Sequence, residues 1–513
     1  MSGFQQLVHK QQGRIRQPIG RVRVAVTVLI PLCTILAALL FALYDARTAL
    51  AFASSDAGLS CRFGINAPWT PITEFDTRPL RLGWYIDYGA AAEPARPDGI
   101  EYVSIIHLRQ TGPNSYTASP NGTTLQNRVR ANRGAAWIVG NEPDRRIFQN
   151  DMEPHLYAAA YHHLYGLIKA ADPTAKVYAG AIVQATPLRL RYLDMVLESH
   201  YRQFGAALRA DGWAIHNFIL NEASCQHYNG DLQICWGADI PPGIDETDGM
   251  RVAVNDNDNF DLFTQQIRAF RLWMHKRGYG GQPVLLSEYG ILMPPDYGEP
   301  KFDAARVNAF MNRTFDYLRT EVDPVLGDPN DGYRLIQRFA WYSTVDRNFN
   351  GFIYDNSVSP PALTAMGQNW AAYASALADE VDFYPVKLST VGPPPLASDG
   401  PSNITLRAVI ANSGNTLGAQ PVTVRFYDGD PTQGGQLIGD PRTVTVAGCG
   451  AQATATVRWD DVPPGVYRVY VDVTAGAGVT ERNLADNRLS TTVFFATDQL
   501  HLPVVMRFNA FRD

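Results

Sequence analysis

Two glutamates each follow directly on a run of apolar residues. Glu142 stands in the motif NEPD (141–144) after the run 136–140, and Glu288 stands in SEYG (287–290) after the run 283–286. Each glutamate therefore lies where a buried strand should meet solvent. Two carboxyl groups at the ends of separate parallel strands can cleave a glycosidic bond, because one donates a proton while the other attacks the anomeric carbon. We predict Glu142 and Glu288 as the catalytic pair.

The elements that would position this pair follow a repeating pattern. Between residues 61 and 380, short apolar runs alternate with longer segments of helical period, as in repeated βα units. Apolar stripes at 157–168 and 263–274 are interpreted as helix faces packed in the core. Strands are predicted at 62–66, 80–88, 102–109, 136–141, 176–183, 212–220, 283–289 and 338–344. Eight such βα units predict an α/β fold, the (β/α)8 TIM barrel, with its site at the carboxyl ends of the strands.

Four further residues fall at predicted strand ends. His107 and Arg109 belong to the third predicted strand, His216 to the sixth and Trp341 to the eighth. Alternation along a strand puts His107 and Arg109 on the same side. We predict these four residues, together with Asn141, as substrate-binding residues. Buried histidines and paired arginines are also ordinary structural features, so a structural role is the alternative for each.

The barrel segment resembles the clan A retaining glycoside hydrolases. Their barrels carry an Asn-Glu acid/base pair after strand four and a nucleophilic glutamate after strand seven, and Asn141-Glu142 and Glu288 fall on those predicted strands. The stretch 169–177 also resembles the helix-to-strand junction that follows the acid/base residue in several families of the clan. The resemblance implies hydrolysis of O-glycosidic bonds in a poly- or oligosaccharide and covers roughly the middle three-fifths of the chain, as expected of a barrel with appendages.

The resemblance also implies individual roles. Ionised Glu288 would attack the anomeric carbon, while Glu142, kept protonated by burial and by the neighbouring negative charge, would protonate the departing oxygen and then act as base. The other implied roles are binding of the sugar 2-hydroxyl by Asn141, stacking on the sugar ring by Trp341, a hydrogen bond from His216 to the nucleophile or a hydroxyl, and a charge from Arg109 that keeps Glu288 ionised. Many clan members carry this arginine on the second strand instead of the third.

Other interpretations stay open at this point. NEP is also a common helix start, and Glu288 alone is compatible with a strand-end salt bridge. A non-catalytic carbohydrate-binding or adhesion protein on the same barrel is the main alternative, since a fold does not determine a function. An esterase is disfavoured because the sequence has no Gly-x-Ser-x-Gly motif.

Composition excludes several classes of function. The net charge is -6 over 513 residues, and the body of the chain has no lysine- or arginine-rich run, so nucleic acid is not an expected partner. No CxxC pair or zinc-site spacing occurs, and the acidic stretch 255–259 lacks the glycine and terminal glutamate of a calcium loop. We expect a carbohydrate partner, no cofactor and no metal.

The amino terminus predicts a membrane segment. Five basic residues in 1–23 precede twenty uncharged residues from Val24 to Leu43. This pattern predicts a single transmembrane helix at 24–44, a cytoplasmic amino end and an extracytoplasmic body. The small residues at 51–53 resemble a signal-peptide cleavage site, so a secreted form is the alternative, but the apolar run is longer than a usual signal-peptide core.

The five cysteines are compatible with an oxidising compartment. Cys225 and Cys235 are ten residues apart in a polar loop and are predicted to form a disulfide. Cys61 and Cys449 fall in different predicted domains and are predicted to stay unpaired.

A second domain follows the barrel. Residues 381–403 are rich in proline, glycine and serine and are predicted to be a linker. Segments of 404–497 alternate polar and apolar residues between glycine-containing turns, which predicts an all-β immunoglobulin-like sandwich. With NSGN at 412–415, Trp459 and ERNLADN at 481–487, this region resembles the bacterial cell-adhesion-related domain CARDB, which implies a spacer or a weak binder. No role is assigned to the tail 498–513.

Overall fold

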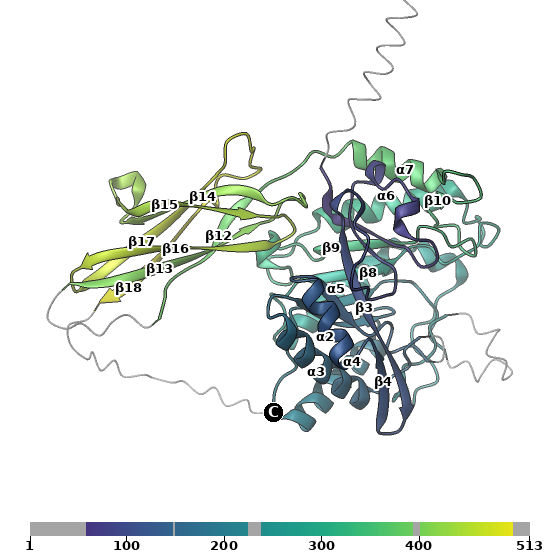
Figure 1. Cartoon of the computed structure of the whole chain (residues 1–513). Helices are drawn as coiled ribbons and strands as arrows, with labels where there is room; N and C mark the ends of the chain where they lie inside the picture. The colour runs from purple at the N-terminus through teal and green to yellow at the C-terminus, as the bar shows by residue number, and fades with distance from the viewer. Residues whose placement is uncertain (1–57, 147–148, 224–236, 393–400, 496–513) are drawn as a thin grey trace, which may run out of the picture. The chain divides into compact units, whose positions relative to one another are not determined.

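The structure is a computed structural model that describes residues 58–146, 149–223, 237–392 and 401–495 (Figure 1). All of these residues belong to one compact unit. The predicted membrane segment at 24–44, the Cys225–Cys235 pair and the tail 498–513 lie outside the described residues. Among the helices that the structure does describe, none combines the length and the apolar character needed to cross a bilayer.

Eight parallel strands close into a barrel. In spatial order they are β2 (Leu82–Ile86), β1 (Ser60–Asn66), β9 (Arg338–Tyr342), β8 (Val284–Tyr289), β7 (Gly212–His216), β6 (Lys176–Ile182), β5 (Ala136–Val139) and β3 (Glu101–Gly112). Pairing of β2 with β3 closes the ring, and β4 (Ser115–Ser119) extends β3 as an antiparallel hairpin. The predicted TIM barrel is therefore confirmed, and each predicted strand overlaps an observed one.

Helices surround this barrel (Figure 1). They are α2 (Gly122–Ala131), α3 (Pro154–Ala171), α4 (Pro187–Phe204), α5 (Phe260–Lys276), α6 (Ala304–Thr320) and α7 (Ala365–Ser375). The predicted stripes are confirmed as buried faces: α3 buries Tyr161 and Ile168, and α5 buries Phe263 and Phe270. The Asn259 side chain caps α5 by accepting hydrogen bonds from the first backbone N–H groups, which this residue type does well. Helix burial thus fixes the strands from outside, and a smaller cluster around Trp84 fills the barrel itself.

The carboxyl-terminal region forms two antiparallel sheets. One contains β12 (Phe383–Thr390), β13 (Ser402–Asn412) and β16 (Ala451–Val462); the other contains β15 (Gln436–Val446), β14 (Gln420–Asp428), β17 (Gly465–Ala475) and β18 (Arg488–Phe495). Valine, isoleucine and leucine side chains that alternate along these strands meet in one core. The predicted linker is partly wrong, because 383–390 is a strand that buries Phe383 and Leu388 in this core. A small additional pair, β10 (Tyr354–Asp355) and β11 (Ala362–Leu363), lies before α7.

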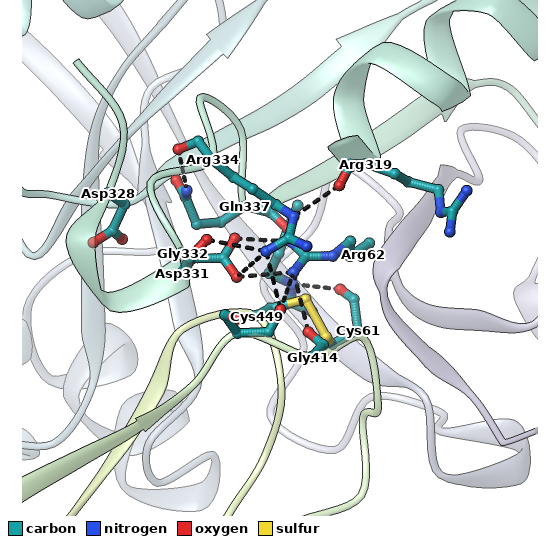
Figure 2. A network of polar contacts seen from close by, with 12 residues as sticks. Cys61, Arg62, Arg319, Asp328, Asp331, Gly332, Arg334, Gln337, Gly414 and Cys449 are labelled. Carbon is teal, nitrogen blue, oxygen red and sulfur yellow. Dashed lines mark hydrogen bonds and ion pairs between the residues drawn. A yellow bond between two sulfur atoms is a disulfide. The ribbon is translucent and has the colours of Figure 1, made fainter. Parts of the chain in front are cut away.

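A buried arginine joins the barrel to the sandwich (Figure 2). Arg62 on β1 makes a two-pronged contact with Asp331, with both N–O distances 2.8 Å. The same guanidinium donates to the backbone carbonyls of Ser413 and Gly414, at 2.8 and 3.0 Å. Arg334 also donates to the Ser413 carbonyl, at 3.1 Å. The NSGN segment that resembles CARDB therefore supplies backbone acceptors that fix the sandwich to the barrel.

A disulfide between Cys61 and Cys449 lies beside this arginine (Figure 2). The prediction that both cysteines stay unpaired is therefore wrong. The two residues are 388 positions apart in the chain, so their spacing carries no information about pairing. Their approach depends on β1 and the loop 447–450 meeting at the barrel–sandwich contact, where the Cys61 backbone N–H also donates to the Asn415 carbonyl at 2.9 Å.

Removing this disulfide is expected to destabilise the whole unit. A Cys61→Ser, Cys449→Ser double variant should lose about 2–4 kcal/mol of unfolding free energy, because the covalent link constrains the unfolded chain. Chemical unfolding followed by tryptophan fluorescence, with and without a thiol reductant, measures the effect. The reductant should destabilise the wild type but leave the double variant unchanged. An equal response of both proteins would assign the stabilisation to other cysteines.

Candidate active site

Both candidate glutamates lie at the carboxyl end of the barrel strands. Glu142 follows β5, the fourth barrel strand along the chain, and Glu288 is the next-to-last residue of β8, the seventh. Only 2% of Glu142 and 6% of Glu288 is exposed. One carboxylate oxygen of Glu142 and one of Glu288 lie within 4.8 Å of each other. The two acids are 146 residues apart in sequence, yet their carboxyl groups lie side by side in the fold.

The loop that carries Glu142 is fixed by a buried ion-pair network. Arg189 on α4 pairs with Asp144 and Glu222, and all three side chains are 0% exposed. Arg189 also donates to the Asp144 backbone carbonyl at 2.8 Å. Glu142 itself adopts a φ of 44°, in the left-handed region that non-glycine residues rarely occupy. Backbone strain of this kind occurs at functional sites when the surrounding structure enforces it, as the Arg189 network does here.

His216, the last residue of β7, lies between the two glutamates. Its Nδ1 is 3.0 Å from Glu142 Oε1, and its Nε2 is 3.4 Å from Glu288 Oε1. The ring is fully buried. The sequence predicted His216 as a contact of the nucleophile or of a sugar hydroxyl, and the structure brings it to both carboxyl groups.

The arginine beside the pair is Arg145 and not Arg109. Arg145 Nη1 lies 3.2 Å from Glu142 Oε2. Arg109 is exposed on the β3–β4 hairpin, where it pairs with Thr117, and within the described residues it contacts neither glutamate. The predicted role of Arg109 in keeping Glu288 ionised is therefore wrong. Arg145 follows Glu142 by three residues, so its proximity in sequence was the signal that could have identified it.

The two carboxyl groups differ in their electrostatic surroundings. Burial raises the pKa of Glu142, but Arg145 and His216 offset this effect and hold the pKa below its usual range. Burial raises the pKa of Glu288 to about 7; the charge of His216 opposes this rise, and the charge on Glu142 adds to it. These shifts favour the charged form of Glu142 and, at pH values below about 7, the protonated form of Glu288 in the protein without substrate. The expectation that Glu142 is kept protonated is wrong for this state, because the Arg145 guanidinium and the His216 ring stabilise its charged form.

Asn141 and His107 occupy the same end of the barrel. The Asn141 amide donates to Gln149 Oε1 at 3.1 Å, while its Oδ1 accepts no hydrogen bond from any described residue. His107 Nε2 lies 2.8 Å from the Tyr88 carbonyl. Neither residue contacts a glutamate carboxyl in the hydrogen bonds of the described chain, so their substrate-binding roles stay predictions.

At the end of β9, the charge of Glu288 acts on Tyr342, whereas Trp341 is buried in the core. Trp341 is 0% exposed, packs on Tyr289 and donates its indole N–H to the Gly351 carbonyl at 2.7 Å. A sugar cannot stack on this ring, so the predicted platform is wrong. Burial and the charges of Glu288 and Asp346 raise the pKa of the Tyr342 phenol, which donates a hydrogen bond to Asp346 Oδ2 at 3.0 Å. Burial and the charge of Glu288 also raise the pKa of Tyr88, after β2.

Two exposed aromatic residues stand on loops that leave the carboxyl ends of barrel strands. Trp69 is three residues beyond the end of β1 and is 73% exposed, and Tyr297, in the loop after β8, is 53% exposed. Large aromatic surfaces are unusual in water and often mark binding sites. Neither residue stands at a predicted strand end, so the pattern that located the other candidates gives no signal for Trp69 or Tyr297.

The described residues contain one cluster whose atoms could bind a metal ion. Its three ligating atoms, from Glu142, His216 and Glu288, lie within 4.8 Å of one another. The ring of His216 presents different nitrogens to the two carboxylates. A single ion binds one nitrogen of an imidazole, whereas a proton-bearing ring contacts two acceptors through both nitrogens. The arrangement therefore fits hydrogen bonding and proton transfer better than metal coordination.

Comparisons with known proteins find low similarity only. No protein-family model and no curated protein matches the chain. A family 128 endo-β-1,3-glucanase from Amycolatopsis mediterranei, solved with laminaritriose, is 16% identical over 61% of this chain and 99% of its own, with a TM-score of 0.38. A glucosidase from Croceicoccus marinus is 11% identical over 80% and 95%, with a TM-score of 0.39. A CARDB domain from Pyrococcus furiosus, solved with di-metal ions, is 20% identical over 23% and 96%, with a TM-score of 0.18.

Proposed function

We propose that this protein is a retaining glycoside hydrolase in which Glu288 is the nucleophile and Glu142 the acid/base residue. The observation that carries the proposal is the buried pair of carboxyl groups at the mouth of the barrel, with oxygens within 4.8 Å. Retaining enzymes hold their two carboxyl groups about 5–5.5 Å apart, whereas inverting enzymes leave about 6.5–9.5 Å for a water molecule. The short separation favours retention.

The reaction would take place in two steps. Glu288 Oε attacks the anomeric carbon while Glu142 gives a proton to the departing oxygen, which leaves a glycosyl ester on Glu288. Esterification removes the charge of Glu288, and Glu142, now ionised and paired with Arg145, takes a proton from the attacking water. The contacts around Glu142 suit this second step, because Arg145 and His216 stabilise its charged form.

The first step needs the opposite distribution of charge. Glu288 must be ionised to attack, and Glu142 must hold the proton. One proton therefore has to pass from Glu288 to Glu142 before the glycosidic bond breaks.

Hydrolysis of a polysaccharide panel tests the proposed function. Purified protein is incubated with laminarin, cellulose, xylan, mannan and starch, and new reducing ends are measured, with a Glu142→Ala, Glu288→Ala double variant as the blank. The proposal predicts release from at least one glycan by the wild type alone. Binding of a glycan with equal affinity by both proteins, without release, would support the alternative of a non-catalytic binding or adhesion protein.

An extracytoplasmic location is part of the proposal. The Cys61–Cys449 disulfide supports it, because disulfides persist in oxidising compartments and are rare in the cytosol. The uncharged segment from Val24 to Leu43 supports a single-pass membrane anchor. The sandwich receives no chemical role in this proposal.

Trp69 is expected to bind a sugar ring remote from the cleavage point. A Trp69→Ala variant should raise KM for a polymeric substrate about threefold to tenfold, as loss of one aromatic stacking contact implies. KM for a small aryl glycoside of the same sugar should not change, because such a substrate ends at the glutamates. Tyr201→Ala is the matched control, since Tyr201 is 63% exposed on α4 and not on a loop at the mouth. Equal KM values for polymer in all three proteins would exclude this contact.

A further inference from the structure

His216 contacts both candidate catalytic acids, one through each nitrogen of its ring. Glu142 Oε1 is 3.0 Å from Nδ1, and Glu288 Oε1 is 3.4 Å from Nε2 on the opposite side of the ring. Neither Nε2 nor Glu288 Oε1 has a hydrogen-bond partner among the described residues, although both atoms are buried. A buried polar atom without a partner is costly and points to a contact that forms during function.

The hydrogen bond to Glu142 indicates which nitrogen carries a proton. An ionised carboxylate only accepts hydrogen bonds, so Nδ1, which contacts the charged Glu142, is the protonated nitrogen. In the neutral ring, Nε2 is then an acceptor 3.4 Å from Glu288 Oε1. Burial lowers the pKa of His216, but the charges of Glu288 and Glu142 outweigh burial and raise it, which favours transfer of a proton to Nε2. Glu288 receives no ion pair from lysine or arginine in the described chain, whereas Glu142 receives one from Arg145.

We propose that His216 relays one proton from Glu288 to Glu142 before the first chemical step, an inference that rests on the proposed function. The O–H bond of Glu288 breaks as its proton bonds to Nε2. The Nδ1–H bond breaks as that proton bonds to Glu142 Oε1. The imidazole ends as its other neutral tautomer, and the negative charge has moved from Glu142 to Glu288. No further reactant is required.

The geometry requires only a small movement. Hydrogen bonds of this kind span about 2.7–3.2 Å, so Nε2 and Glu288 Oε1 need to approach by a few tenths of an ångström. Catalytic hydrogen bonds are often long without substrate and shorten in its complex. The Nδ1 contact already has hydrogen-bond length.

The other side chains around His216 do not offer a second path for the proton. Asp144 influences His216 by its charge, but it is held by Arg189. Burial and the charge of Glu288 raise the pKa of the Tyr88 and Tyr342 phenols well above neutral, so both stay protonated, and Tyr342 donates to Asp346 Oδ2 at 3.0 Å. The ring of Phe218, 6.2 Å from the imidazole centroid, is apolar.

The dependence of rate on the leaving group tests the relay. His216→Asn retains an amide that can donate a hydrogen bond but cannot transfer a proton. The test uses two glycosides of the sugar released from the panel, a 2,4-dinitrophenyl glycoside, whose leaving group needs no proton, and a methyl glycoside, whose leaving group does. Loss of a general-acid proton costs about 10²–10⁴-fold. We expect His216→Asn to lower kcat/KM about 100-fold for the methyl glycoside at every pH, because Glu142 stays without its proton. For the dinitrophenyl glycoside the loss should fall below about threefold at a pH above the pKa of Glu288, where the nucleophile ionises to solvent without the relay.

A buried histidine outside the site provides the matched control. His200 on α4 is 3% exposed and bonds His162 and the Ala206 carbonyl. His200→Asn should leave the ratio of the two kcat/KM values at the wild-type level. Equal loss on both glycosides in His216→Asn, at the pH where Glu288 is ionised, would assign His216 a purely structural role and overturn the relay.

Infrared spectroscopy tests the starting state without any substrate. Near neutral pH, the wild type should show the C=O stretch of a protonated buried carboxyl group that Glu288→Gln removes and Glu142→Gln retains. The opposite pattern would overturn the relay, because Glu142 would already hold the proton. If no glycoside is hydrolysed, the proposed function fails, and this measurement still decides where the proton lies.

Discussion

Replacing Glu288 by alanine is expected to abolish turnover, with a loss of about 10⁴-fold or more in kcat. The expectation follows from the position of Glu288 in the buried cluster that it forms with Glu142 and His216. Removal of a covalent nucleophile leaves only binding and electrostatic contributions. Initial rates on the glycan identified by the panel measure this effect, and circular dichroism checks that the variant is folded.

Glu142→Ala should give a different pattern. Loss of the general acid lowers the rate about 10²–10⁴-fold on natural glycans but much less on dinitrophenyl glycosides. Azide distinguishes the roles, because in Glu142→Ala it attacks the glycosyl ester on Glu288 in place of water, without needing a base, and gives a glycosyl azide of retained configuration. In Glu288→Ala, azide would replace the nucleophile and give the inverted product. The opposite assignment of products would show that the two glutamates exchange roles.

Replacing Asp331 by alanine is expected to cause a large loss of stability. Asp331 is 0% exposed and pairs with Arg62, which is 2% exposed. Breaking a buried ion pair by removing one partner costs about 3–5 kcal/mol, because the remaining charge stays buried without compensation. Arg62 would keep only carbonyl acceptors, those of Gln337, Ser413 and Gly414. Unfolding by guanidinium should show the loss as a shift of the whole transition, since barrel and sandwich belong to one unit.

An exposed ion pair provides the control for this variant. Asp76 pairs with Arg78, and the two side chains are 53% and 70% exposed. Asp76→Ala should leave the unfolding midpoint within experimental error of the wild type, because exposed pairs contribute little. Equal stability of Asp331→Ala and Asp76→Ala would contradict the account of the Arg62 contact. Separate transitions for barrel and sandwich in Asp331→Ala would show that this contact couples them.

The barrel was predictable because its local signals agree with its fold. Strands buried on both faces read as apolar runs such as 136–139 and 284–286, and helices such as α3 carry a stripe at helical spacing. The positions of Glu142 and Glu288 followed from the same signals, since each carboxyl group ends a run. Their roles in catalysis stay proposals that the experiments above test.

Features that depend on single-residue register or on distant contacts were not predictable. Trp341 and Tyr342 are neighbours on β9, and alternation sends the Trp341 ring into the core and the Tyr342 hydroxyl toward Asp346. A strand boundary derived from sequence is uncertain by more than that one residue. The charge on Glu142 depends on Arg145 and on His216 from another strand, which come together only in the fold. Likewise, the pairing of Cys61 with Cys449 depends on where the sandwich contacts β1.

The configuration of the first product tests the central claim most directly. Proton NMR of the anomeric signal, recorded before the released sugar mutarotates, follows the product from the glycan identified by the panel. Two carboxyl groups at the observed separation predict a product with the anomeric configuration of the substrate. A first product of inverted configuration would contradict the double-displacement mechanism and the role of Glu288 as nucleophile.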